Sequence, residues 1–341
     1  MGPMTRFAVF DSKSYDRSSL GPAAEAADLN LRFYDFRLNE DTLPLVHDVT
    51  GVCAFVNDSL TRPVIEGLAQ AGVGVIAMRC AGFNNVDLQA AADHNILVTR
   101  VPAYSPYAVA EHAVALLMAL NRKVTRAHAR VHDMNFTLDG LVGWDMHGKT
   151  VGLIGTGKIG KIAGQIFKGF GMRVVCWDPY PDQAWADETG CEYVKLDELG
   201  RLSDVVSVHV PLLPETDHII NAMTLAEFKR GVYIVNVSRG ALVDTKALIK
   251  ALKSGHVAGV ALDVYEEEEG KFFEDLSGEV MVDDKLARLM TFPNVIITAH
   301  QAFLTEEALG EIARVTVENL RRYRLGDEPL PGTVLGPNGP L

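Results

Sequence analysis

Basic side chains are in deficit in this sequence of 341 residues, and cysteines are few. It contains 32 Lys and Arg against 44 Asp and Glu, a formal net charge of -12 at pH 7. Because phosphate binding needs a surplus of Lys and Arg, the sequence predicts no nucleic-acid partner. The cysteines form no C-x-x-C pair and have no His at zinc-finger spacing, so no metal site is predicted. We interpret Cys53, Cys80, Cys176 and Cys191 as reduced thiols, which are typical of a cytoplasmic protein.

Long hydrophobic runs are missing as well. No apolar run reaches the ~20 residues of a membrane span, and the N-terminus lacks a charged-then-apolar signal sequence. We therefore expect a cytoplasmic protein with no membrane association. With 48% hydrophobic and 22% charged residues the composition is that of a globular protein, and the length suggests two domains.

Short apolar runs alternate with helix-like stretches along most of the chain. One series occupies residues 6–101 and a second occupies residues 150–300. Between them lies a long helical pattern from Pro106 to about Val131, apolar nearly all round in its first part, which predicts burial against other elements or another subunit. Alternation of this kind predicts parallel sheets with right-handed crossovers, an α/β fold.

The helical pattern returns after His300, from about Thr305 to Tyr323. We therefore predict that the chain crosses between two domains near residues 102 and 300. Residues 1–101 and 300–341 are expected to form one domain, and residues 102–299 the other.

A glycine-rich turn follows the predicted strand TVGLIG. Gly155, Gly157 and Gly160 form G-x-G-x-x-G in the strand–turn–helix setting that a dinucleotide site needs. The N-terminus of the helix supplies free N–H groups to a pyrophosphate. Asp178 ends the next predicted strand, about 20 residues further on, where a ribose-binding carboxylate is expected. No Arg or Lys lies beside it to accept a 2′-phosphate, so NAD is favoured over NADP; the alternative is a tight turn that binds no ligand.

The segment VNVSRGALVD, residues 235–244, begins as a buried strand and then places an Arg at its end. Desolvating Arg239 is costly unless an anion pairs with it. Its planar guanidinium can bind a carboxylate through two N–H···O bonds. We therefore expect Arg239 to hold the carboxylate of a small 2-oxo or 2-hydroxy acid and to polarise its carbonyl group.

Two more polar residues follow predicted strands: Glu268 lies just beyond ALDVY, and His300 closes NVIITAH. Parallel sheets bind ligands at the carboxyl ends of their strands, so both are candidates for the same site. Reduction of a carbonyl group needs a proton carrier, a role that suits a His oriented by a carboxylate. The alternatives are a core histidine with satisfied hydrogen bonds and a solvated acidic run over residues 266–269.

Four segments together resemble the D-specific 2-hydroxyacid dehydrogenases. GTGKIG with Asp178, NVSRGALVD, GVALDVYEEE and TAHQAFLT occur in the order and spacing of that family. RCAGFNNVD, residues 79–87, and VPAYSPYAVAEH, residues 101–112, narrow the resemblance to its D-lactate dehydrogenases. The resemblance covers nearly the whole chain.

The resemblance implies a catalytic set of Arg239, Glu268 and His300. It implies a flavodoxin-like domain and a Rossmann-like domain with a cleft between them, the first domain binding substrate and the second binding NAD. The implied substrate contacts are Ala81, Gly82, Tyr104 and Phe303, the last walling the methyl side of the pocket. The implied nucleotide contacts, beyond the three glycines, are Lys158, Ile159, Asp178, Val210, Pro211, Thr216, Val237, Ser238 and Asp263.

The expected function is reversible hydride transfer between NADH and pyruvate that gives D-lactate, in a homodimer or homotetramer. Two alternatives remain at this point. One is a D-2-hydroxyacid dehydrogenase for larger 2-oxo acids. The other is a dinucleotide-binding corepressor or sensor without turnover, against which the intact Arg, Glu and His set argues.

Overall fold

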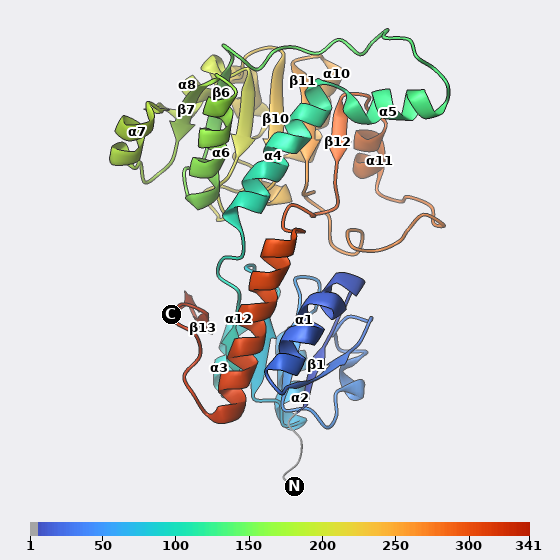
Figure 1. Cartoon of the computed structure of the whole chain (residues 1–341), viewed down its shortest axis with the longest axis vertical. Helices are drawn as coiled ribbons and strands as arrows, with labels where there is room; N and C mark the ends of the chain where they lie inside the picture. The colour runs from blue at the N-terminus through green and yellow to red at the C-terminus, as the bar shows by residue number, and fades with distance from the viewer. Residues whose placement is uncertain (1–5) are drawn as a thin grey trace. The chain divides into compact units, whose positions relative to one another are not determined.

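The computed structural model of the chain describes residues 6–341. It divides into two compact units: unit 1 is Met1–Ser105 with Phe303–Leu341, and unit 2 is Pro106–Ala302. Each unit has a seven-stranded, mostly parallel sheet covered by helices (Figure 1). The predicted α/β fold class is therefore confirmed.

The sheet of unit 1 has the strand order β14-β13-β5-β4-β3-β1-β2. Its first five strands in sequence are parallel, in the flavodoxin-like order 2-1-3-4-5, and β13 and β14 add an antiparallel edge. The strands are β1 Arg6–Val9, β2 Asn30–Phe33, β3 Gly51–Ala54, β4 Val75–Met78, β5 Leu97–Thr99, β13 Val334–Gly336 and β14 Gly339–Pro340.

Two helices from opposite ends of the chain cover one face of this sheet. Leu20 of α1 and Leu320 of α12 pack with Phe7 and Val75 of the strands in one core cluster. The helices of unit 1 are α1 Ser14–Ala26, η1 Leu43–Leu45, α2 Arg62–Gln70, α3 Leu88–Asp93 and α12 Glu306–Leu325. α12 is the helix predicted from about Thr305, whose side chain caps it by accepting a hydrogen bond from the Ala308 N–H.

The sheet of unit 2 is wholly parallel, in the order β12-β11-β10-β9-β6-β7-β8. The order reverses between β6 and β9, and ligands of such sheets bind at the carboxyl ends of the strands beside this reversal. The strands are β6 Thr150–Ile154, β7 Arg173–Trp177, β8 Glu192–Tyr193, β9 Val205–Val208, β10 Val232–Asn236, β11 Val257–Leu262 and β12 Val295–Ile297.

A hydrophobic core cluster of unit 2 lies between its strands and α8, α9, α10 and α11, with Leu199, Leu225, Leu248 and Leu289 contributed by these helices. The helices of unit 2 are α4 Pro106–Asn121, α5 Val124–His132, α6 Lys158–Gly169, α7 Gln183–Thr189, α8 Leu196–Leu202, α9 Ala222–Glu227, η2 Gly240–Leu242, α10 Thr245–Lys253 and α11 Asp284–Met290. None of the helices in the described residues is long and apolar enough to cross a membrane.

The long helical pattern predicted from Pro106 to about Val131 forms two helices instead of one. Lys123, between α4 and α5, has a left-handed backbone with φ of 51°, which no helix interior accepts. α4 is largely buried, as its apolar composition predicts, whereas α5 has no buried residue.

The chain leaves unit 2 after Ala302, a little later than the predicted crossing before His300. The reason lies in Asp263, just after β11. Its backbone carbonyl accepts from the His300 N–H at 2.7 Å, and its carboxylate accepts from the N–H groups of Gln301 and Ala302. Three hydrogen bonds thus hold residues 300–302 to unit 2.

Candidate active site

His300 and Glu268 form the central pair of the site in unit 2. His300 Nδ1 and Glu268 Oε1 lie 2.8 Å apart, and the second oxygen of Glu268 accepts from the Tyr265 N–H at 2.9 Å. An ionised carboxylate can accept hydrogen bonds but cannot donate them, so the proton of this bond is carried by Nδ1 of His300. Nε2 is then the nitrogen that can exchange a proton with a ligand. The two side chains are 20% and 26% exposed, which leaves them accessible.

The backbone of His300 is held in a left-handed conformation, with φ of 54°. Such a conformation in a residue other than glycine is costly unless the surroundings enforce it. Asp263 enforces it here, because it binds residues 300–302 as described above. Burial acts to raise the pKa of the Asp263 carboxyl, but hydrogen bonds from His112, Thr298 and the backbone outweigh this and lower it.

Arg239 follows β10, as the sequence predicts. Its Nη1 donates to the Ser238 carbonyl at 2.7 Å, and no carboxylate of the described residues lies within ion-pair distance of its guanidinium. The backbone beside it passes close to Tyr265: a Cβ on Gly240 would lie 2.0 Å from the Tyr265 carbonyl, so only glycine fits there. Arg239 is therefore a half-buried cation whose Nε and Nη2 have no partner among the described residues and are available to an anion.

The glycine loop after β6 has the geometry that a pyrophosphate requires. Gly155 has φ of 101°, and a Cβ on Gly160 would lie 2.1 Å from the Gly155 carbonyl oxygen. A Cβ on Gly157 would meet nothing within 4 Å, so the space above this residue is open for a ligand. No side chain caps the N-terminus of α6 after Gly157, which leaves its N–H groups available.

Asp178 holds the glycine loop from the end of β7. Its Oδ2 accepts from the Thr156 N–H at 2.6 Å and from the Thr156 hydroxyl at 3.1 Å, and its Oδ1 accepts from the Tyr180 N–H. The Thr156 hydroxyl also lies 2.6 Å from the Tyr193 hydroxyl. Thr156 and Tyr193 were not predicted from the sequence, because neither occupies a defined position of a known sequence motif.

The remaining predicted nucleotide contacts follow β6, β9, β10 and β11. Ser238 donates from its hydroxyl to the Val208 carbonyl at 2.8 Å and so ties the ends of β10 and β9 together. The Thr216 hydroxyl donates to the Pro211 carbonyl at 2.7 Å and accepts from the Leu213 N–H, so it is engaged within its own loop. Lys158 and Ile159 lie at the start of α6, Val210 and Pro211 follow β9, Val237 follows β10, and Asp263 follows β11.

The substrate contacts predicted in unit 1 include an aromatic cluster. Phe303 is 8% exposed, and its ring centroid lies 6.2 Å from that of Tyr104, 6.2 Å from that of Tyr15 and 6.3 Å from that of Phe55. Tyr15 and Phe55 were missed by sequence reasoning. The available signal was their position, because both follow strands at the reversal of the sheet order in unit 1, between β1 and β3.

Ala81 and Gly82 follow β4. No described residue accepts a hydrogen bond from their backbone N–H groups, whereas the Ala81 carbonyl accepts one from Arg100 Nη1 at 2.9 Å. Free N–H groups in such a loop are suited to an anion.

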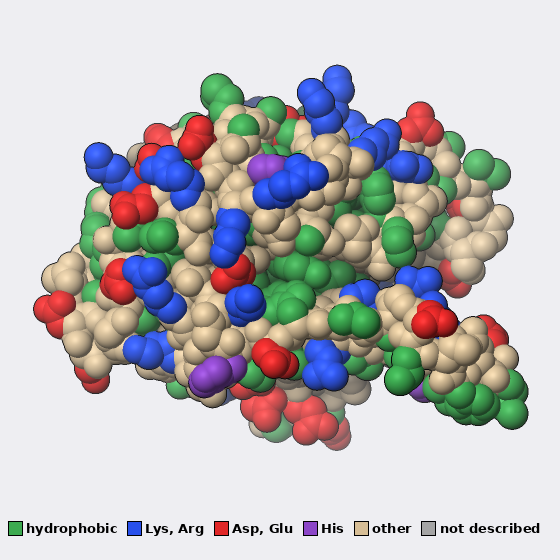
Figure 2. All heavy atoms as spheres, turned by 90° about the horizontal axis from the view of Figure 1, so that it is seen from above, with side chains coloured by type: hydrophobic (Ala, Val, Ile, Leu, Met, Phe, Trp, Pro, Cys, Tyr) green, Lys and Arg blue, Asp and Glu red, His purple; other side chains and the backbone are tan. Residues whose placement is uncertain are grey.

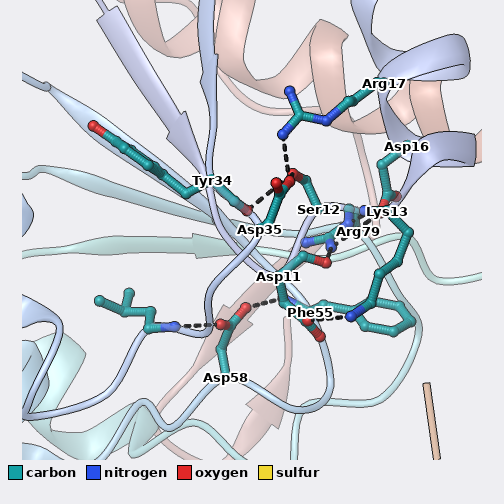
Figure 3. A network of polar contacts seen from close by, with 11 residues as sticks. Asp11, Ser12, Lys13, Asp16, Arg17, Tyr34, Asp35, Phe55, Asp58 and Arg79 are labelled. Atoms are coloured by element: carbon teal, nitrogen blue, oxygen red, sulfur yellow. Dashed lines mark hydrogen bonds and ion pairs between the residues drawn. The ribbon is translucent and has the colours of Figure 1, made fainter. Parts of the chain in front are cut away.

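A buried charge cluster lies beside this loop (Figure 3). Arg79 is 1% exposed; its Nε donates to Asp16 Oδ1 at 2.9 Å, and its Nη2 donates to the Asp11 carbonyl at 2.8 Å. Burial lowers the pKa of Arg79, but Asp16 outweighs it and the pKa is raised. Burial raises the pKa of Asp58 to about 6, against the Arg79 charge and hydrogen bonds from the Phe55 and Leu38 N–H groups. The sequence showed no sign of this cluster.

The chain is similar to known proteins over nearly its whole length. The family model of the D-isomer specific 2-hydroxyacid dehydrogenase NAD-binding domain matches residues 114–302. The D-lactate dehydrogenase of Escherichia coli is 50% identical over 94% of this chain and 98% of that protein. A structure of the pyruvate reductase of Chlamydomonas reinhardtii has a TM-score of 0.91 at 43% identity and covers 96% of this chain and 98% of its own. An NAD-complexed D-isomer specific 2-hydroxyacid dehydrogenase of Lactobacillus delbrueckii ssp. bulgaricus has a TM-score of 0.78 at 31% identity, over 97% and 100%.

A dinucleotide loop at the order reversal of a parallel sheet, with a His–carboxylate pair in the same unit, defines an NAD-dependent oxidoreductase. The chain belongs to the D-isomer specific 2-hydroxyacid dehydrogenase family. Its cofactor is NAD, and the open space at Gly157 and the free N-terminus of α6 fit that group.

Proposed function

We propose that this chain is a D-lactate dehydrogenase, which interconverts pyruvate and D-lactate with NADH and NAD+. One observation carries the proposal: unit 2 combines the glycine loop with a hydrogen-bonded His300–Glu268 pair and with Arg239, a cation that has no carboxylate partner among the described residues. The similarity to proteins named D-lactate dehydrogenase and pyruvate reductase supports this choice of substrate.

The residues of unit 2 divide the chemistry between them in this proposal. Arg239 binds the substrate carboxylate with two parallel N–H···O bonds and polarises the neighbouring carbonyl group. His300 donates a proton from Nε2 to the carbonyl oxygen during reduction and takes it back during oxidation. Glu268 accepts from Nδ1, which fixes the ring orientation and stabilises the imidazolium. When bound, NADH supplies the hydride.

For unit 1 we propose substrate contacts of its own. Ala81 and Gly82 offer N–H groups to the carboxylate, and Tyr104 and Phe303 enclose the methyl group. We identify the predicted substrate domain, residues 1–101 and 300–341, with unit 1 and the predicted NAD domain, residues 102–299, with unit 2, except that residues 102–105 belong to unit 1 and residues 300–302 to unit 2. A dehydrogenase for larger 2-oxo acids would need more room for the substrate side chain, and three aromatic rings lie around Phe303.

We further propose that the protein is a cytoplasmic homo-oligomer, a dimer or a tetramer. All four cysteines are buried free thiols, which suits a reducing compartment. Beyond α5, the side chains of Met134, Phe136, Leu138 and Val142 are 66–83% exposed. Apolar side chains also gather on the projection at the lower right of Figure 2, and exposed apolar patches typically mark protein contacts.

Steady-state rates with a series of 2-oxo acids test the proposal, each with NADH and with NADPH, followed by chiral analysis of the product. We expect pyruvate and NADH to give the highest kcat/KM and D-lactate to be the product. Replacing Asp178 by Ser should relax the preference for NADH, because the carboxylate repels a 2′-phosphate. Faster reduction of 2-oxoisocaproate than of pyruvate would contradict the lactate assignment, and tight NADH binding without turnover would favour a sensor.

A further inference from the structure

The loop after β4 exposes N–H groups because its carbonyl groups are engaged elsewhere. The Cys80 carbonyl accepts from the Val101 N–H at 3.1 Å, and the Gly82 carbonyl accepts from the Cys80 thiol at 3.3 Å. Between them, the Ala81 carbonyl accepts from Arg100 Nη1 at 2.9 Å. In a trans peptide the N–H points away from the carbonyl of the same unit, so the N–H groups of Ala81, Gly82 and Phe83 point away from these three anchors.

Arg100 is the one charged anchor of the three. It follows β5, where its backbone N–H donates to the Thr333 carbonyl at 2.8 Å. Its guanidinium carbon lies 5.3 Å from the centroid of the Phe83 ring. The Phe83 ring, which belongs to the loop, therefore packs against the guanidinium that binds the Ala81 carbonyl of the same loop.

No anion of the described residues neutralises Arg100. No carboxylate lies within ion-pair distance of its guanidinium, and its Nε is buried without a hydrogen-bond partner. Burial lowers the pKa of Arg100, whereas in Arg79 the same effect is outweighed by Asp16. Two arginines that follow neighbouring strands of unit 1, β4 and β5, therefore differ: Arg79 has its counter-ion within the fold, and Arg100 does not.

We propose that Arg100 is a positioning residue for the substrate carboxylate, acting through the Ala81–Gly82 peptide. Its hydrogen bond to the Ala81 carbonyl fixes the direction of the Gly82 N–H and polarises the peptide, which makes that N–H a stronger donor. Its unpaired charge adds attraction for an anion at the loop. The inference rests on the proposed function, which places the 2-oxo acid carboxylate at these N–H groups.

The charge and the anchor can be separated by substitution. Arg100→Met removes both, Arg100→Gln keeps a donor for the Ala81 carbonyl without the charge, and Arg100→Lys keeps the charge without the planar fork. The matched control is Arg17→Met, because Arg17 also lies over an aromatic ring, Phe33, at 5.2 Å but contacts no loop carbonyl.

The measurements are kcat and KM for pyruvate, the NADH dissociation constant, and the dissociation constant of oxamate from the NADH complex. We expect Arg100→Met to raise KM and weaken oxamate binding by about tenfold, the lower range for a hydrogen bond to a charged group. The Gln and Lys variants should fall between this variant and the wild type. NADH affinity and kcat should change little, because the carboxylate is bound alike in the ground and transition states.

Unchanged KM and oxamate affinity in Arg100→Met would overturn the proposal. The proposal would also be overturned if kcat and NADH affinity fell by the same factor by which KM rose, since this would indicate general damage to the fold rather than weaker binding of the carboxylate. A wild-type enzyme that reduces no 2-oxo acid would instead contradict the proposed function, and this inference with it. If another 2-oxo acid proves the best substrate, the same series is measured with that acid, because the carboxylate is common to all.

Discussion

Two loops of this protein present backbone N–H groups to anions, and they do so by different means. The loop after β6 in unit 2 uses glycines: a Cβ at Gly155 or Gly160 would strike backbone atoms, so only glycine lets the chain turn there. The loop after β4 in unit 1 relies on partners that hold its carbonyl groups, Val101, Arg100 and the Cys80 thiol. The first arrangement is local in sequence, and the second joins residues about 20 positions apart.

The same contrast holds for the charged side chains of the two units. In unit 2, Arg239 and the His300–Glu268 pair remain partly exposed and available for proton transfer and anion binding. In unit 1, Arg79 is buried and paired with Asp16. The comparison predicts that changes at the unit 2 site mainly reduce the rate constant, whereas changes in unit 1 mainly alter affinity and selectivity.

Replacing His300 by Ala should have the largest effect. Loss of a general acid typically lowers kcat by about 10²–10⁴-fold, and NADH affinity should be retained because the glycine loop is intact. Glu268→Gln should lose less, since the imidazole remains but its orientation and charge are less well supported. Pre-steady-state and steady-state pyruvate reduction would measure both.

His94→Ala, an exposed histidine of unit 1, is the matched control and should have wild-type kcat. A His300→Ala enzyme with near-normal kcat would remove His300 from the chemistry and weaken the contrast between the units.

Arg239→Lys is expected to come second, with kcat/KM for pyruvate reduced roughly 10- to 100-fold, the range for a lost hydrogen bond between charged groups. Lys keeps the charge but not the planar fork, so KM should rise and kcat should fall together. Arg230→Lys, at the other end of β10, is the control. If Arg239→Lys altered NADH affinity alone, Arg239 would belong to the cofactor site and not to the substrate.

Between pH 7 and pH 5, the buried titratable groups should change the stability of the two units in opposite directions. Burial lowers the pKa of His209, in unit 2, from 6.5 to about 4. Between these values the unfolded chain binds more protons than the folded chain, so the stability of unit 2 decreases as the pH is lowered. Burial raises the pKa of Asp58, in unit 1, from 3.8 to about 6, so over that range the folded chain binds more protons and stability rises as pH falls. From pH 7 to pH 5, His209 should cost unit 2 about 2 kcal/mol and Asp58 should contribute about 1 kcal/mol to unit 1.

Tryptophan fluorescence reports unit 2 alone, because Trp144, Trp177 and Trp185 all lie there. We expect unfolding followed by fluorescence to shift to lower temperature between pH 7 and pH 5 by more than hydrogen exchange in the β3 peptides indicates for unit 1. His209→Gln should reduce this shift. Equal destabilisation of both units would show that other groups dominate.

Phe303→Ala should have the smallest effect on turnover and the clearest effect on selectivity. One methylene group in an apolar pocket is worth about 1–3 kcal/mol of discrimination, and we expect the preference for pyruvate over branched 2-oxo acids to narrow by about tenfold. Ratios of kcat/KM for pyruvate and 2-oxoisocaproate measure it, with Phe33→Ala as a control at a ring outside the cluster. An unchanged ratio would place Phe303 outside the methyl wall.

Much of the fold and part of the site were predictable from local patterns. Alternating apolar runs identified both parallel sheets, and G-x-G-x-x-G followed by Asp178 identified the dinucleotide loop, because a strand, a tight turn and a helix N-terminus are adjacent in sequence. The break between α4 and α5 was not predicted, since the left-handed Lys123 has no glycine to mark it. The roles of Tyr15, Phe55 and Arg100 were also missed, because their partners are distant in the chain.

The sequence by itself determined which residue types this protein brings to its chemistry: glycines at a turn, and an Arg, a Glu and a His each following a parallel strand. Tertiary structure alone decided which charges are neutralised within the fold. Arg79 and Arg100 are the same residue type and lie 21 positions apart, yet Arg79 pairs with Asp16 and Arg100 binds the Ala81 carbonyl. The physical reason is that a buried charge is neutralised only by a group of opposite charge within a few ångströms of it. That group comes from another strand or helix, which the fold brings into contact.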